Sequence, residues 1–211
     1  TVLLSSLAGA LQAQRAPGRC TPPDSTAEWY RRQREWLCAA STGSDTALRN
    51  ELLAAAALDP SAKLAAQVGW QRAGKTSNAG SPAADAAVVK LQAMARTRGG
   101  PWPTKSVVGA AGVRAAWLLA QRDTALQRVT LRRMMESGPE EALGADVAVL
   151  EDRVRLQSGR KQLYGTQLRE ENGQLVPAPM EDSAHVDMRR DGAGLPPLAA
   201  AICAAKRAPA S

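Results

Sequence analysis

The residues best suited to chemistry are carboxylates on either side of position 160. Glu151 and Asp152 end a predicted helix, and Glu170 and Glu171 follow on a predicted hairpin. Two carboxylates about 5–9 Å apart can cleave a glycosidic bond, one acting as acid and the other as base or nucleophile. Solvated glutamates, with Asp152 paired to an arginine such as Arg153, would explain the same residues. The sequence leaves both interpretations open.

Asp152 stands out because it lies on an apolar face of its predicted helix. Leu143, Val147, Leu150 and Val154 form one apolar stripe, and Asp152 lies on the opposite side, among further apolar residues. A helix that is apolar on two faces is covered on both. A carboxylate in such a place needs a hydrogen-bond partner or a functional role.

The next segment, 162–167, is the most strand-like stretch of a chain that otherwise predicts helices. It reads Gln-Leu-Tyr-Gly-Thr-Gln, and its Gly165 permits close approach of a ligand or of another backbone. Asn172-Gly173 is a strong signal for a hairpin turn. We therefore predict strands near residues 162–169 and 174–177.

Polar side chains from several elements are expected to converge on one pocket beside this hairpin. A small polar ligand or an envelope protein would bind there. The alternatives are a buried network that locks the hairpin onto the helices, or a cell-wall hydrolase that uses Asp152 and Asp123 as its carboxylates. The predicted binding residues are Gln121, Asp123, Asp152, Arg153, Gln162, Tyr164, Thr166, Gln167 and Arg189.

Other motifs carry little weight. Residues 69–76 match the phosphate-loop pattern G-x-x-x-x-G-K-T, but a predicted helix precedes them where that loop needs a strand. Ser158 and Lys161 have the spacing of serine acyl-enzymes at a helix end rather than a helix start. His185 is the single histidine, and no C-x-x-C is present. We therefore expect no metal site and no cofactor.

Several of these segments resemble an uncharacterised bacterial family over about residues 91–198. The specific feature is the Gln-Leu-Tyr-Gly-Thr-Gln box at 162–167, followed by Pro177 and by Asp-Met-Arg-Arg at 187–190. The resemblance implies a domain type and no reaction, because no activity is established for the family. Its members often carry Gln-His-Asp where this chain has Gln-Arg-Asp at 121–123, which weakens an enzymatic interpretation of this copy.

The elements that must position these residues are mainly helices. Capping and proline signals, with helical spacing of apolar residues, predict a single-domain bundle of about seven or eight helices with one small β-hairpin near its C-terminal third. The most apolar helix, 107–120, is expected in the middle of the bundle. The predicted helices are 25–40, 45–58, one from about 59 to 70, 82–98, 107–120, 124–136, 139–157, 184–190 and 197–205.

Composition and the N-terminus predict where the protein acts. Net charge is +7, yet no basic run is interleaved with aromatic residues, so nucleic acid is a poor candidate partner. Residues 2–13 combine a short apolar run with small residues at a possible cleavage site, which fits a truncated export signal. We therefore expect a periplasmic or secreted protein, with 1–19 as signal and leader, 20–205 as the domain and 206–211 as a tail. No transmembrane helix is expected in the mature chain.

Three cysteines fit an oxidising compartment. Cys20, Cys38 and Cys203 allow one disulfide and one remaining thiol. The sequence does not choose among the three pairings.

Overall fold

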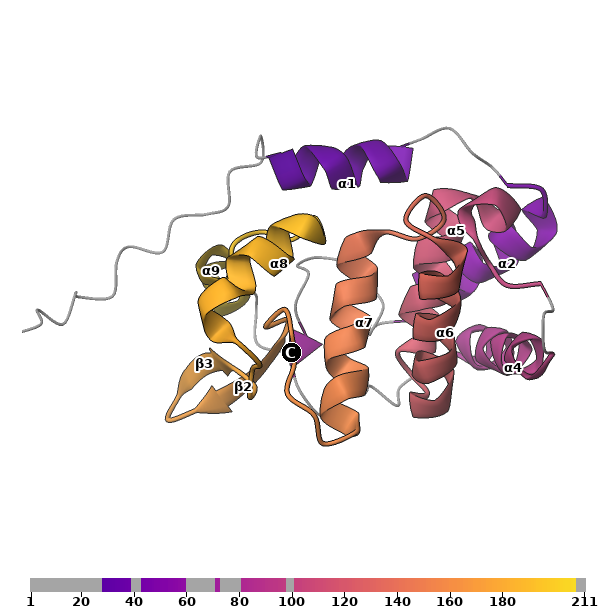
Figure 1. Ribbon diagram of the computed structural model, residues 1–211. Coiled ribbons are helices and arrows are strands. Elements are labelled where there is room, and N and C mark those ends of the chain that lie inside the picture. Colours follow the sequence, from indigo (N-terminus) through magenta and orange to yellow (C-terminus); the bar gives the residue numbers. More distant parts are fainter. Residues whose placement is uncertain (1–27, 39–42, 60–70, 73–80, 98–100, 208–211) are drawn as a thin grey trace, which may run out of the picture.

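The computed structural model describes residues 28–38, 43–59, 71–72, 81–97 and 101–207. Within these ranges the chain forms eight α-helices, a single 3₁₀ turn and three short strands (Figure 1). The predicted class, a mainly helical fold with a small hairpin near its C-terminal third, is confirmed. In chain order the elements are α1 (Glu28–Cys38), α2 (Thr46–Ala57), β1 (Gln71–Arg72), α4 (Pro82–Arg96), α5 (Lys105–Ala120), α6 (Thr124–Ser137), α7 (Gly144–Gln157), β2 (Gln167–Glu171), β3 (Gln174–Pro177), η1 (Ser183–His185), α8 (Val186–Gly192) and α9 (Leu198–Arg207).

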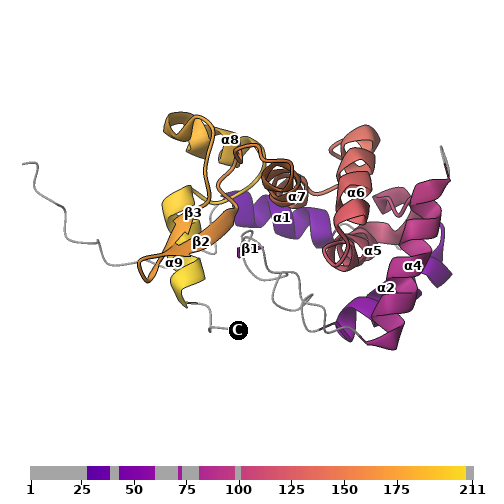
Figure 2. The same cartoon turned by 90° about the horizontal axis from the view of Figure 1, so that it is seen from below.

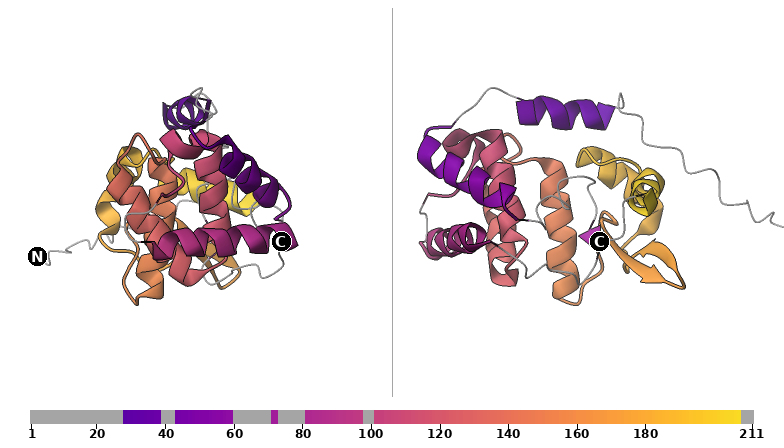
Figure 3. Two further views of the ribbon diagram at one scale, coloured as in Figure 1. Left: turned by 90° about the vertical axis from the view of Figure 1, so that its right-hand side faces the viewer. Right: turned by 180° about the vertical axis from the view of Figure 1, so that it is seen from behind.

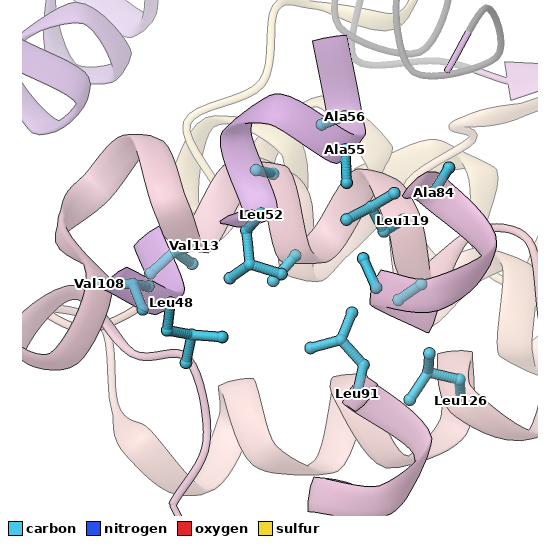
Figure 4. Packing of buried hydrophobic residues seen from close by; sticks show 14 of the residues in the cluster. Leu48, Leu52, Ala55, Ala56, Ala84, Leu91, Val108, Val113, Leu119 and Leu126 are labelled. Carbon is cyan, nitrogen blue, oxygen red and sulfur yellow. The ribbon is translucent and has the colours of Figure 1, made fainter. Parts of the chain in front are cut away.

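Helix α5 lies at the centre of the helical half, as its apolar sequence predicts. The helices α2 and α4 cover one side of it (Figure 3), and α6 completes the cluster. In the close view of Figure 4, Leu52 of α2, Leu91 of α4 and Leu119 of α5 enclose one apolar centre. Alanines fill most of the remaining contacts, so these helices approach closely and bury little area per residue.

Helix α7 joins this half to the C-terminal part that carries the hairpin (Figures 1 and 2). One side of it buries Leu150 against Trp117 of α5, and the other buries Ala148 beside Leu195. The helix is therefore covered on two faces, as predicted. Above them, α1 spans both parts: its Trp36 packs against the cluster that contains Leu52 and against the cluster that contains Leu195. Gln33 of α1 donates to the carbonyl of Gly194 at 2.8 Å.

The sheet differs from the predicted hairpin in two ways. Strand β2 begins at Gln167 rather than near Gln162, because the preceding backbone follows the loop described below. A third strand, β1, pairs with β2 in parallel, with Gln71 opposite Gln167. It belongs to the segment that matches the phosphate-loop pattern, and the rest of that segment lies outside the described residues. The strand order is β1-β2-β3.

Two helix starts also depart from prediction. Helix α7 begins at Gly144, since residues 138–143 form a turn, and α5 begins at Lys105. Within α5, Gly109 has φ +68° and kinks the helix. The helix expected from about 59 to 70 and the signal and leader, residues 1–19, lie outside the described residues.

The structure narrows the choice among the three possible disulfide pairings. Cys203 is disulfide-bonded, whereas Cys38 is a free and exposed thiol. The pairings that use Cys38 are therefore excluded, and Cys20 lies outside the described residues. No described helix combines the length and apolar character that crossing a bilayer requires.

Candidate functional site

The carboxylate of Asp152 is enclosed by residues 162–166, which we call the box loop. Asp152 is fully buried, and its Oδ1 accepts hydrogen bonds from the backbone N–H groups of Leu163 at 2.6 Å and Tyr164 at 3.0 Å. Its Oδ2 accepts from the N–H of Tyr164 at 3.2 Å and from the N–H and hydroxyl of Thr166 at 2.9 and 2.8 Å. Hydrogen bonds to an ionised acceptor are roughly twice as strong as neutral ones. One side chain of α7 therefore fixes the whole loop.

Two arginines of α8 hold the carbonyl groups of the same loop. Arg189 Nε donates to the carbonyl of Leu163 at 2.9 Å, and Arg190 Nη1 donates to the carbonyl of Tyr164 at 2.5 Å. The residue Tyr164 thus gives its N–H to a buried carboxylate and its carbonyl to a buried guanidinium. The negative charge of Asp152 and the positive charge of Arg190 therefore act on each other through the backbone of Tyr164, without a direct ion pair.

Residues 163–166 of the box loop do not form a strand, because their backbone groups bond to these side chains instead of a neighbouring strand, whereas Gln162 forms an isolated parallel bridge with Met180. Gly165 allows the tight course with φ +66°, a conformation that costs a residue with a Cβ about 1–2 kcal/mol. A Cβ at this position would also come within 2.9 Å of Leu198 on α9. The close approach expected at Gly165 is therefore to the protein's own C-terminal helix.

Two glutamines lock the hairpin behind the loop. The fully buried amide of Gln162 donates to the carbonyls of Gln167 at 3.1 Å and Ala178 at 2.8 Å. Its Oε1 accepts from the N–H of Gln167 at 2.9 Å. The side chain of Gln167 in turn donates to Val149 of α7 and to the hydroxyl of Thr166, each at 3.3 Å. Their amides are committed to the protein's own backbone.

The residues expected from the end of α5 form a separate group. Arg153 is buried and donates to Gln121 Oε1 at 2.9 Å, and burial lowers the pKa of Arg153. Asp123 caps α6, where its Oδ1 accepts from the N–H of Leu126 at 2.5 Å. Within the described residues, no hydrogen bond or ion pair joins Asp123 to the box loop. The structure therefore brings Asp152 together with the box residues and with Arg189. Gln121, Asp123 and Arg153 lie apart from them, where the end of α5 is followed by α6 and contacts α7.

These contacts bear directly on the carboxylate chemistry considered above. Asp152 is closed off from solvent with both oxygens occupied, and Asp123 serves as a helix cap. Asp152 is held by backbone amides rather than by an arginine ion pair, which differs from the structural alternative suggested by the sequence. Asp152 therefore exposes no oxygen that could exchange a proton with a substrate, and Asp123 is engaged through its Oδ1 as a helix cap.

Two half-buried polar groups near the box loop have no partner in the described chain: the carboxylate of Glu151, one residue before Asp152, and the hydroxyl of Tyr164. Glu151 is half-buried, and no hydrogen bond or ion pair engages its carboxylate within the described residues. The hydroxyl of Tyr164 is likewise unpartnered in this part of the chain, although its ring packs beside Leu143 and Leu195. Burial raises the pKa of Glu151, and burial followed by the charge of Glu151 raises the pKa of Tyr164. The charge of Glu151 thus acts on the hydroxyl of Tyr164, and we call these two residues the Glu151–Tyr164 face.

Charged groups around this face are mostly paired with each other. Arg155 forms an ion pair with Glu181 and donates to a carbonyl at 2.7 Å. Arg189 contacts Asp182 at 3.1 Å. Arg160 is exposed, and its charge, like that of Arg155, opposes the rise of the Glu151 pKa.

Two important residues were absent from the predicted set. Arg190 is fully buried, with Nε bonded to the carbonyl of Pro196 at 2.5 Å and Nη2 without a partner. Burial lowers the pKa of Arg190 to about 10, while the charges of Asp187 and Asp152 act in the opposite direction. The Asp-x-x-Arg-Arg segment was the signal for Arg190, but spacing alone gave no means of choosing between its arginines. Glu151 is a candidate carboxylate in the sequence, where a solvated role is the alternative, but it is not among the predicted binding residues.

Comparison with known proteins agrees with the resemblance noted from the box. The profile of a family of unknown function, DUF6624, matches residues 32–208. The chain belongs to this family. Searches of curated proteins and of solved structures gave no match. Membership of DUF6624 therefore establishes the domain and leaves its activity to be argued from the site. Within the described residues, no group of three or more histidine, cysteine or acidic side chains could hold a metal ion.

Proposed function

We propose that this protein is an exported bacterial binding protein, and that it holds a small polar ligand at the Glu151–Tyr164 face. The observation that carries the proposal is a half-buried carboxylate beside a half-buried hydroxyl, neither with a hydrogen-bond partner in the described chain. Partly buried polar groups gain from a partner that restores the hydrogen bonds lost with water. A ligand that donates to Glu151 and bonds to Tyr164 provides such a partner.

The box loop supports this proposal because it makes the face rigid. Tyr164 is fixed through its own backbone by Asp152 on one side and Arg190 on the other. A residue whose backbone is held in place before binding loses less conformational entropy when the ligand binds. The buried network and the binding face are then two parts of a single arrangement, in which the network positions the groups that bind.

Export is supported by the disulfide at Cys203, since disulfides persist in oxidising compartments and are rare in the cytosol. Binding is favoured over hydrolysis because Asp152 and Asp123 are both committed to backbone amides. These contacts support our proposal that the protein acts in the periplasm or outside the cell, where a small polar ligand or an envelope protein is accessible.

A thermal-shift screen with peptidoglycan fragments and polar metabolites tests the proposal. A ligand at about one hundred times its dissociation constant stabilises the fold by about 2.7 kcal/mol, or about 5–10 °C for a chain of this size. We expect Glu151→Gln and Tyr164→Phe to lose most of that shift. Glu170→Gln provides a matched control, since it makes the same chemical change at an exposed carboxylate on β2. Equal shifts in all four proteins would remove the proposed face.

A further inference from the structure

Helix α1 differs from the other described α-helices in how little of it is buried. It lies over α5, α7 and α8 along one side of the molecule (Figures 1 and 3). Each of the other α-helices contributes at least one buried side chain, whereas every described side chain of α1 is exposed or half-buried. An isolated helix of 11 residues is only marginally stable in water. Helix α1 therefore depends on its contacts with the fold and would unwind on leaving them.

Several of these contacts are of kinds that contribute little stability. Arg32 forms an ion pair with Asp191 at 3.1 Å in which both side chains are exposed, and such pairs contribute little. Gln33 donates to the carbonyl of Gly194. The ring of Trp36 packs on apolar neighbours, but its indole N–H is buried without a hydrogen-bond partner in the described chain. A buried donor without an acceptor is unfavourable, and detachment of α1 would return it to water.

The surface under Trp36 is shared with the proposed binding face. The rings of Trp36 and Tyr164 pack against one small apolar cluster, which we call the Leu195 cluster. Detachment of α1 would therefore uncover apolar surface next to Tyr164. The Leu195 cluster consists of Leu143, Ala145, Ala148 and Leu195.

A covalent bond restrains the N-terminal side of α1. Cys203 on α9 is disulfide-bonded and Cys38 is a free thiol, and the sequence contains three cysteines. Within one chain the bond can therefore join Cys203 only to Cys20, which precedes α1 in the sequence. A detached α1 would then still be tied at both ends, to α9 through the disulfide and to α2 through the chain. A segment tied at both ends gains less conformational entropy on detachment than a segment with a free end.

We propose that α1 is a strap over the Leu195 cluster, held closed by the Cys20–Cys203 disulfide and released when a dithiol reduces that bond. The dithiol supplies two electrons and two protons: its two sulfurs join in a new disulfide, the bond between the cysteines breaks, and each cysteine becomes a thiol. The strap then detaches while the remaining helices keep their fold. This proposal is independent of any ligand at the Glu151–Tyr164 face, so its test needs none.

Hydrogen exchange of the full chain, read by mass spectrometry before and after treatment with dithiothreitol, tests the proposal. We expect the amides of α1 to exchange at least about tenfold faster after reduction, near the rate of an unstructured peptide, while α5 and α7 stay protected. The double variant Cys20→Ser, Cys203→Ser should show the same change without reductant. Cys38→Ser is the matched control: it removes a thiol and keeps the disulfide, so its α1 should exchange as in the wild-type protein.

A second pair of variants tests the strap in the oxidised protein. Trp36→Ala should speed exchange in α1 about tenfold, because it removes the ring that packs on the Leu195 cluster. The neighbouring Leu37 is 40% exposed, and Leu37→Ala should change exchange in α1 by less than about threefold, since both residues favour a helix.

Three results would overturn the proposal. One is an α1 that keeps its protection after reduction. Another is loss of protection by the same factor in α1, α5 and α7, because the disulfide would then stabilise the whole fold rather than the strap. The third is a peptide map of the unreduced protein without a link between Cys20 and Cys203. Equal effects of Trp36→Ala and Leu37→Ala would refute the role of Trp36 in holding the strap.

Discussion

Replacing Asp152 with asparagine is the sharpest test of the network beneath the proposed face. Asparagine has the same shape, but it substitutes an NH₂ donor for one carboxylate oxygen. If the NH₂ group replaces Oδ1, it faces the N–H groups of Leu163 and Tyr164. If it replaces Oδ2, it faces those of Tyr164 and Thr166. At least one buried donor is left without an acceptor, and the remaining bonds lose their charge.

The size of the effect follows from these losses. A buried unsatisfied donor costs about 1–3 kcal/mol, and the loss of charge weakens each remaining hydrogen bond by about 1 kcal/mol. We therefore expect Asp152→Asn to lower the free energy of unfolding by about 3–5 kcal/mol. At about 2–4 °C per kcal/mol for a chain of this length, the melting temperature falls by about 10–15 °C.

Urea unfolding followed by circular dichroism measures this change, and hydrogen exchange at residues 163, 164 and 166 locates it. Asp123→Asn is the matched control, since asparagine caps a helix about as well as aspartate. It should cost less than about 1 kcal/mol. The reasoning fails if the two variants lose equal stability, or if the three amides in Asp152→Asn stay as protected as in the wild-type protein.

Three further outcomes are expected. Gly165→Ala should destabilise the fold by about 2 kcal/mol or more, while Gly159→Ala, with similar φ but open space around it, should cost about 1 kcal/mol; equal costs in urea unfolding would contradict the close contact at Gly165. Because burial raises the pKa of Glu151, the folded state holds its proton more tightly and loses stability as pH rises from the ordinary carboxyl pKa through the raised one. Glu151→Gln should therefore gain stability relative to wild type between about pH 4 and pH 7, and a constant difference would refute this. Cys38 should react with a maleimide in the native, unreduced protein and Cys203 only after reduction, as mass spectrometry can show; labelling of Cys203 without reduction would contradict its disulfide.

The residue types of the Gln-Leu-Tyr-Gly-Thr-Gln box at 162–167 have a physical explanation. Its first and last residues, Gln162 and Gln167, bond to each other and to the hairpin. Its Thr166 bonds to Asp152 through both backbone and side chain. The separate arginine segment supplies Arg190 to the opposite side of the loop. The box and the arginine segment are therefore the two sides of one clamp, although about twenty residues separate them.

The sequence by itself determined the helical class, the central place of α5, the hairpin turn and the burial of Asp152. Each follows from local rules: apolar spacing, capping signals, or the preference of Asn-Gly for a tight turn. It also placed most of the polar box residues in one network. These properties depend on neighbours in sequence, or on which face of a helix a residue occupies.

Only the tertiary structure decided the role of each polar group. Asp152 could have met an arginine, a substrate or a backbone, and the course of the box loop gave it three backbone amides and a hydroxyl. Glu151, its neighbour, is half-buried and keeps an unpartnered carboxylate in the described chain. Adjacent positions on a helix face directions about 100° apart. Which of the two is committed to the fold and which remains for a ligand therefore depends on the segment that packs against each.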